Sequence, residues 1–123
     1  MSDRPTILVA DDYPENCQLF SIYLRKAYDV VVVASAEEAE ATIRAGGIDA
    51  ALLDLNYQGG MTGLDLIRRI RADDQVAGLP ALALTAHASP DDRRRCLEAG
   101  FDAYLSKPVL KAQMLEAVEQ LLA

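Results

Sequence analysis

Short apolar runs alternate with helical patterns five times along this chain, and this alternation constrains the fold more than any other feature. Runs this short, bounded by turn residues, are typical of buried strands. Strands that alternate with helices form βα units around a parallel sheet. The predicted strands are Thr6–Ala10, Val30–Ala34, Ala50 to Leu53 or Asp54, Ala81–Thr85, and Ala103 to Leu105 or Ser106. The pattern predicts an α/β fold of five βα units.

The segments between these runs carry the usual signals of helix ends. Pro14 and Pro90 suit the first turn of a helix. Ser35 and Ser89 suit N-caps, and Glu38 three residues after Ser35 predicts a capping box. Glycines after the second and fourth segments suit helix ends. The predicted helices are 14–27, 36–45, 64–72, 90–99 and 110–122.

The first predicted helix has an unusually wide apolar face. At 100° per residue its apolar side chains cover an arc of about 220°, more than core packing requires. The flank at Leu19 and Ile22 is either a partner surface or packs against a neighbouring element. We expect this flank to pack against a neighbouring element.

Length and charge restrict the class of protein. A chain of 123 residues is expected to form one domain, 1–123. It has no apolar stretch near the roughly 20 residues of a membrane span and no apolar signal region at its start, so we expect a cytoplasmic location. A net charge of −7 argues against nucleic-acid binding. Cys17 and Cys96 lie outside any CxxC spacing and are expected to be free, buried thiols.

Polar side chains follow the predicted strands at the edge where ligands bind in open parallel sheets: Asp11, Asp12, Asp54, Thr85 and Lys107. Each alone has an ordinary explanation as a cap, turn, strand or loop residue. Together they suit phosphoryl chemistry, because clustered carboxylates favour Mg²⁺ and a carboxylate can form an acyl phosphate. The lysine and the threonine hydroxyl could hold phosphoryl oxygens, and such transfer depends mainly on positioning and charge.

Four motifs match a known family with suitable spacing over nearly the whole chain. They are Leu-Val-Ala-Asp11-Asp12, Leu-Leu-Asp54-Leu, Leu-Thr85-Ala86 and Tyr104-Leu-Ser-Lys107-Pro108. Together they resemble the receiver domain of two-component response regulators, the CheY-like family. The resemblance implies a doubly wound, flavodoxin-like sheet with strand order 2-1-3-4-5. It also implies a Lys107-Pro108 bond that is commonly cis in receivers.

The resemblance assigns a role to each site residue. Asp54 is similar to the phospho-accepting aspartate, and Asp11 and Asp12 to the acidic pair that binds Mg²⁺ with it. Asn56 would lend its backbone carbonyl to the cation. Lys107 is similar to the lysine that contacts the phosphoryl group. The phosphoryl donor would be a sensor histidine kinase or a histidine phosphotransfer protein.

The same resemblance implies a conformational switch. Thr85 is similar to the switch hydroxyl and Tyr104 to the aromatic rotamer switch, which together change the surface of the fourth helix, fifth strand and fifth helix. That surface would control a downstream effector or an output domain, and receivers often form homodimers through it. Such a protein is a switch acting on itself, rather than an enzyme with a separate substrate. The residues at the positions of Asn56 and His87 influence phosphate lifetime in receivers.

The loop after Asp54 departs from the family. The family loop often contains Met-Pro, whereas this one reads Leu-Asn-Tyr-Gln-Gly-Gly-Met-Thr-Gly63, lacks the proline and is one residue longer. This keeps open the alternative of a pseudo-receiver that binds proteins without being phosphorylated. A dehalogenase-type phosphatase is disfavoured by the missing Asp-x-Asp motif, and a flavin-binding module by the acidic first loop. We expect either a single-domain regulator or a fragment of a longer one.

Overall fold

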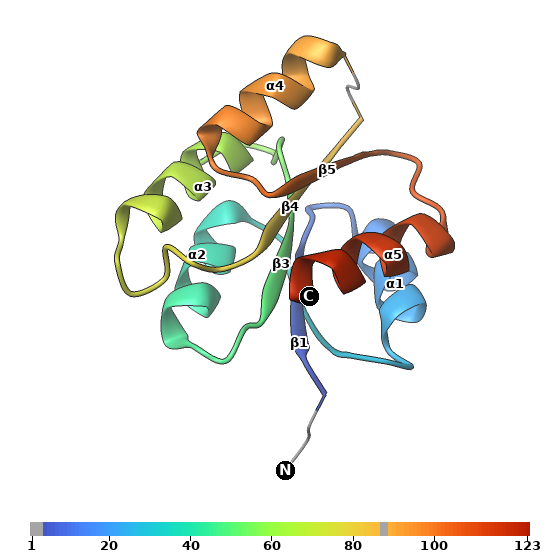
Figure 1. The fold of residues 1–123 in the computed structure, drawn as a ribbon. Helices are drawn as coiled ribbons and strands as arrows, with labels where there is room; N and C mark the ends of the chain where they lie inside the picture. Colours follow the sequence, from blue (N-terminus) through green and yellow to red (C-terminus); the bar gives the residue numbers. More distant parts are fainter. Residues whose placement is uncertain (1–3, 87–88) are drawn as a thin grey trace.

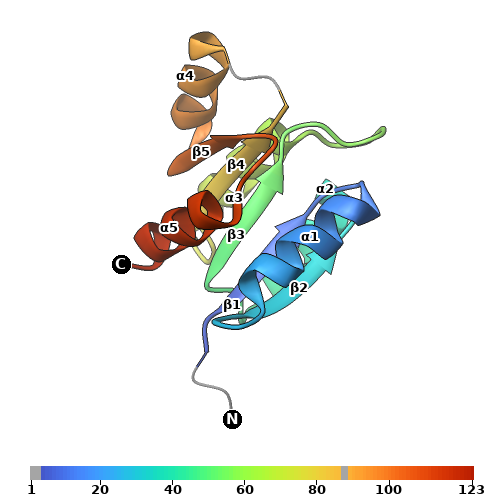
Figure 2. The ribbon, with the colours of Figure 1, turned by 90° about the vertical axis from the view of Figure 1, so that its right-hand side faces the viewer.

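The computed structural model describes residues 4–86 and 89–123, which contain a five-stranded parallel sheet with helices on both faces (Figure 1, Figure 2). The strand order is β2-β1-β3-β4-β5. The α/β fold and the strand order implied by the resemblance are therefore confirmed. The strands are β1 (Thr6–Ala10), β2 (Asp29–Val33), β3 (Ala50–Asp54), β4 (Ala81–Thr85) and β5 (Ala103–Ser106).

The helices lie close to their predicted positions: α1 (Pro14–Leu24), α2 (Ala36–Ala45), α3 (Gly63–Ala72), α4 (Pro90–Ala99) and α5 (Lys111–Leu122). The prediction for α1 was wrong at its end, which comes three residues earlier than 27. The amides of Ala27 and Tyr28 both donate to the Leu24 carbonyl, so the chain turns there towards β2. Strand β2 also begins and ends one residue earlier than predicted, because Asp29 pairs with Thr6 and Val33 with Ala10 in the sheet register.

The predicted caps form at both serine positions. The Ser35 hydroxyl accepts from the Glu38 amide and the Ser89 hydroxyl accepts from the Asp92 amide, each at 3.1 Å. The capping box predicted at Ser35 is incomplete, because the Glu38 carboxylate accepts from the Ser35 hydroxyl at 3.4 Å instead of from the Ser35 amide. A complete capping box forms at the start of α3. The Lys107-Pro108 bond is cis, as the resemblance implied.

The sheet separates two apolar layers. One contains Leu8 and Leu53 with residues of α2, α3 and α4, and the other contains Val9 and Leu52 with residues of α1 and α5. Figure 1 shows α2 and α3 on one side of the sheet and α1 and α5 on the other. Every residue of β3 and β4 is buried, as expected for central strands of a parallel sheet covered on both faces.

The expected packing of the first helix's apolar flank was wrong. Leu19 is 41% exposed and Ile22 is 51% exposed, so both lie outside the core contacts of α1. Phe20 and Leu24 are the residues of α1 that are buried. No helix in the described part of the chain is long and apolar enough to cross a membrane.

Candidate functional site

Three aspartates meet where β1 and β3 end side by side. Ala10 pairs with Leu53 in the sheet register, so the residues that follow them emerge next to each other. One carboxylate oxygen from each of Asp11, Asp12 and Asp54 lies within 4.8 Å of the others. Asp11 and Asp54 are buried, and Asp12 is half-buried.

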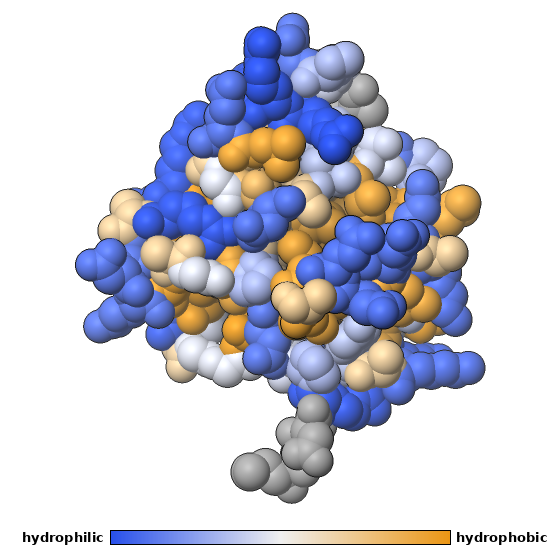
Figure 3. Space-filling model, viewed as in Figure 1, coloured by the Kyte–Doolittle hydropathy of each residue, from blue (hydrophilic) through white to orange (hydrophobic). Residues whose placement is uncertain are grey.

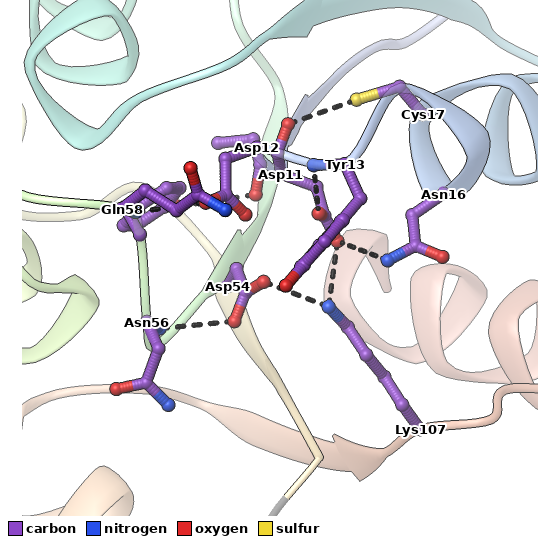
Figure 4. A network of polar contacts seen from close by, with 11 residues as sticks. Asp11, Asp12, Tyr13, Asn16, Cys17, Asp54, Asn56, Gln58 and Lys107 are labelled. Carbon is purple, nitrogen blue, oxygen red and sulfur yellow. Dashed lines mark hydrogen bonds and ion pairs between the residues drawn. The ribbon is translucent and has the colours of Figure 1, made fainter.

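Lys107, the residue that follows β5, connects two of these carboxylates. Its Nζ donates to Asp11 Oδ2 at 2.7 Å and to Asp54 Oδ2 at 2.8 Å (Figure 4). Burial lowers the pKa of Lys107, but the hydrogen bonds to the two carboxylates outweigh it and leave the pKa above its ordinary value. The ammonium therefore stays charged and partly neutralises the cluster.

The pKa of Asp54 is raised above its ordinary value. Burial is the largest cause, and it outweighs the opposing hydrogen bonds from Lys107 and from the Asn56 amide. The nearby Asp11 carboxylate raises it further. Additional positive charge beside Asp54 would therefore stabilise its ionised form.

Asp12 has one satisfied oxygen and one that lacks a partner. Its Oδ2 accepts from the Gln58 amide at 2.9 Å, while its buried Oδ1 has no hydrogen-bond partner among the described residues. A buried carboxylate oxygen left unpaired is costly. A cation that takes oxygen ligands would pair with it, and Mg²⁺ is such a cation. The donor set present therefore fits Mg²⁺.

Other groups fix the orientation of Asp11. Its Oδ1 accepts from the Tyr13 amide at 2.9 Å and its Oδ2 accepts from Asn16 Nδ2 at 3.1 Å. The Cys17 thiol donates to the Asp11 carbonyl at 3.2 Å. Tyr13 and Asn16 were not predicted as site residues, because a helix start leaves no signal of which amides and side chains turn back to the strand end. Both cysteines are free, as predicted, but only Cys96 is buried as expected, whereas Cys17 is half-buried.

A pocket of about 310 Å³ opens onto Asp54 between Asn56, Ala86 and Lys107. Thr85 does not line this pocket. It is buried and faces a neighbouring groove of about 490 Å³ between α3 and α4, which Asn56 also lines. The Lys107 amide donates to the Thr85 carbonyl at 2.7 Å, so the two residues are adjacent through the backbone.

Tyr104 lies further from the cluster. It is half-buried, pairs with Ala83 in the sheet and lines a third groove with residues of α4. The structure thus brings Asp11, Asp12 and Asp54 into one cluster, in which Lys107 contacts Asp11 and Asp54. Thr85 and Tyr104 lie beside this cluster. His87, named in the sequence analysis, is outside the described residues.

Comparisons with known proteins agree with this arrangement. The family described as "Response regulator receiver domain" matches residues 7–119. Sensory/regulatory protein RpfC of Xanthomonas campestris pv. campestris is 35% identical over 119 residues, which are 94% of this chain but only 16% of that protein. Chemotaxis protein CheY of Pseudomonas aeruginosa is 32% identical over 120 residues, 94% of each chain.

A solved structure gives the same result for the fold. A putative response regulator from Chloroflexus aurantiacus superposes with a TM-score of 0.92 at 31% identity, over 98% of each chain. Receiver domains of this kind are signalling switches, rather than classical enzymes, and phosphorylation-dependent switching is their general function. The family match covers residues 7–119, and the strand order and the acidic cluster agree with it. This chain therefore belongs to the response regulator receiver domain family.

Proposed function

We propose that residues 1–123 form a single receiver domain that accepts a phosphoryl group on Asp54 and signals through its α4-β5-α5 surface. The observation that supports this most is the shared contact of Lys107 with Asp54 and Asp11, next to the unpaired oxygen of Asp12. Relatives that include sensor proteins and DNA-binding response regulators support histidine kinases and effectors as the general classes of partner.

The transfer step follows from the chemistry of these side chains. A carboxylate oxygen of Asp54 attacks the phosphorus of a phosphohistidine on a sensor kinase or phosphotransfer protein. A P–O bond forms, the P–N bond breaks, and the histidine nitrogen takes the electron pair. Lys107, already 2.8 Å from Asp54, is placed to neutralise an oxygen of the incoming group. Water then hydrolyses the acyl phosphate, which releases inorganic phosphate and restores the Asp54 carboxylate.

Mg²⁺ would be held by Asp11, Asp12 and Asp54 together with the backbone carbonyl of Asn56. When bound, it would neutralise the carboxylates and the phosphoryl oxygens during transfer. Without it, an incoming phosphoryl group would meet three negative side chains and one ammonium. The cluster of three aspartates and the unpaired Asp12 oxygen support this assignment.

The output step uses Thr85 and Tyr104. The acyl phosphate would draw the Thr85 hydroxyl towards its oxygens, and Tyr104 would turn into the space that Thr85 leaves. Helix α4 suits such a change, because Cys96 is its only buried residue. An effector that prefers the new shape would stabilise it.

The surface beside Tyr104 has room for a partner. A groove of about 530 Å³ lies along α4, lined by Pro90, Arg93, Leu97 and Tyr104, and Leu97 is 42% exposed. Figure 3 shows hydrophilic residues over α4 at the top of the view, with apolar residues directly below them. The partner is an effector protein, an attached output domain or a second copy of this chain. We place this signalling in the cytoplasm.

The proposal is tested by phosphorylation with a small donor. The protein and its Asp54→Ala variant are incubated with Mg²⁺ and acetyl phosphate or phosphoramidate, and their intact masses are measured. We expect a gain of one phosphoryl group that requires Mg²⁺ and disappears in the variant. If the protein gains none under conditions that modify a known receiver, the phosphorylation proposal fails. The pseudo-receiver alternative would then account better for the altered loop.

A further inference from the structure

The loop between β3 and α3 is attached to the acidic cluster at several points. The Gln58 amide donates to Asp12 Oδ2 at 2.9 Å, and the Tyr57 hydroxyl donates to the Ala10 carbonyl at 3.2 Å. The Gly63 amide donates to the Leu55 carbonyl at 2.9 Å and closes the base of the loop. The lengthened loop is therefore an ordered part of the site, and its position affects how Asp12 is presented.

One further attachment comes from outside the site. Glu37, in the first turn of α2, accepts a hydrogen bond from the Met61 amide to its Oε2 at 2.8 Å. This amide lies three residues after the Gln58 amide that holds Asp12. A carboxylate accepting from an amide makes a charge-assisted hydrogen bond, which is stronger than a neutral one.

Gly60 leaves the space that this contact needs. Its φ is +72°, a conformation that favours glycine, and a Cβ there would lie 2.7 Å from Glu37 Oε2. Any larger residue at this position would displace the Glu37 carboxylate and strain the loop. The glycine and the glutamate thus fit each other at the tip of the altered loop.

We propose that Glu37 is a positioning residue for the cation site, acting through the Met61 and Gln58 amides on Asp12. This inference rests on the proposed function, since it assumes that the cluster takes Mg²⁺. The Asp12 carboxylate is turned by its bond to Gln58 so that Oδ1 stays free of protein partners among the described residues. Releasing Met61 from Glu37 loosens the segment that carries Gln58, so Asp12 loses its fixed orientation.

The expected effect is moderate because Glu37 acts at one remove from the ligands. Groups that directly orient metal ligands typically change affinity by about 10- to 100-fold when removed. For Glu37→Ala we expect Mg²⁺ affinity to fall by about 3- to 10-fold. The maximal phosphorylation rate at saturating Mg²⁺ should stay near that of the unmodified protein, because Asp54 and Lys107 are untouched.

The test measures Mg²⁺ affinity by titrating the protein with MgCl₂ and following backbone amide shifts by NMR. Glu37→Ala should weaken binding, and Glu37→Gln, which keeps an acceptor oxygen, should restore much of the loss. Gly60→Ala should weaken binding as Glu37→Ala does. In the metal-free protein, hydrogen exchange of the Met61 amide should accelerate in Glu37→Ala.

The matched control is Glu38→Ala, which removes the same charge from the neighbouring exposed position of α2. If Glu38→Ala and Glu37→Gln weaken Mg²⁺ binding as much as Glu37→Ala does, the effect is long-range charge and the positioning role is refuted. Unchanged affinity in Glu37→Ala, with Asp54 still phosphorylated, refutes it and leaves the proposed function standing. Glu37-dependent Mg²⁺ binding without any phosphorylation of Asp54 would instead refute only the proposed function.

Discussion

The ammonium nitrogen of Lys107 lies 2.8 Å from Oδ2 of Asp54, although the two residues are 53 positions apart in the chain. The same nitrogen lies 2.7 Å from Asp11 Oδ2. One cation thus compensates two buried carboxylates, and removing it would leave both without that compensation. The proposed chemistry depends on this contact.

Replacing Lys107 with methionine should separate cation binding from transfer. Mg²⁺ should bind more tightly to Lys107→Met, because the competing positive charge is gone. The phosphorylation rate at saturating Mg²⁺ should fall by about 10²-fold, since an oriented charge on the phosphoryl group is lost. Phosphorylation rates with phosphoramidate as the donor, measured over a range of MgCl₂ concentrations, check both effects. Lys111→Met is the exposed-lysine control. An unchanged rate in Lys107→Met would exclude a role for this ammonium in transfer.

Mg²⁺ should stabilise the folded protein through Asp12. A ligand that binds only the folded state raises the free energy of unfolding by RT ln(1 + [L]/Kd). We expect the melting temperature to rise with MgCl₂ in the unmodified protein and in Asp74→Asn, whose exposed carboxylate lies outside the cluster. In Asp12→Asn the rise should largely disappear. Equal rises in all three proteins would show that the cation acts elsewhere.

Glu40 should make stability depend on pH. It is buried between α2 and α3 and accepts from Arg44 at 2.8 Å and from Arg69 at 2.9 Å. Burial raises the pKa of Glu40, but the hydrogen bonds from Arg69 and Arg44 outweigh it and hold the pKa below its ordinary value. A lowered pKa means that the stabilisation is complete above the unfolded-state pKa and is lost as the pH falls through the folded-state value.

Glu40→Gln should therefore destabilise the protein by about 1–3 kcal/mol at neutral pH. The difference from the unmodified protein should shrink as the pH falls below about 4, where the carboxylate is protonated. Urea unfolding of both proteins at several pH values measures this difference in unfolding free energy. A difference that does not change with pH would mean that packing, rather than charge, accounts for the loss.

Gly63 should tolerate no side chain, in contrast to Gly78. A Cβ on Gly63 would lie 2.2 Å from the Asp54 carbonyl oxygen and 2.8 Å from Leu55 Cα, both backbone atoms. Gly63→Ala should cost about 2–4 kcal/mol of unfolding free energy and displace the end of β3. Gly78→Ala, with nothing within 4 Å of the added atom, should change stability by less than about 0.5 kcal/mol. Similar unfolding midpoints for both variants would show that a side chain at Gly63 does not clash with the backbone.

Thr85 should be needed for output and dispensable for phosphorylation. It is buried but does not line the pocket that opens onto Asp54. Thr85→Ala should therefore still gain one phosphoryl group, while the amide shifts of α4 and β5 on phosphorylation become smaller than in Thr85→Ser. These amide shifts are measured in NMR spectra of the phosphorylated Thr85→Ala and Thr85→Ser proteins. Full-sized shifts in Thr85→Ala would remove this residue from the switch.

The sequence by itself determined the elements and the members of the acidic cluster. Short apolar runs such as 50–53 are local patterns, and a parallel sheet places the residues after them at one edge. For this reason Asp11, Asp12, Asp54 and Lys107 could be named before the structure. The strand order came from the resemblance, since periodicity along the chain contains no information about which strands pair.

Only the tertiary structure decided the contacts between distant groups. It showed that Lys107 joins Asp11 to Asp54, that Glu37 holds the loop at Met61, and that the flank of α1 is exposed. Side-chain contacts between residues far apart in the chain depend on the relative placement of whole elements. Local propensity does not encode that placement, because it is set by packing of the two layers against the sheet.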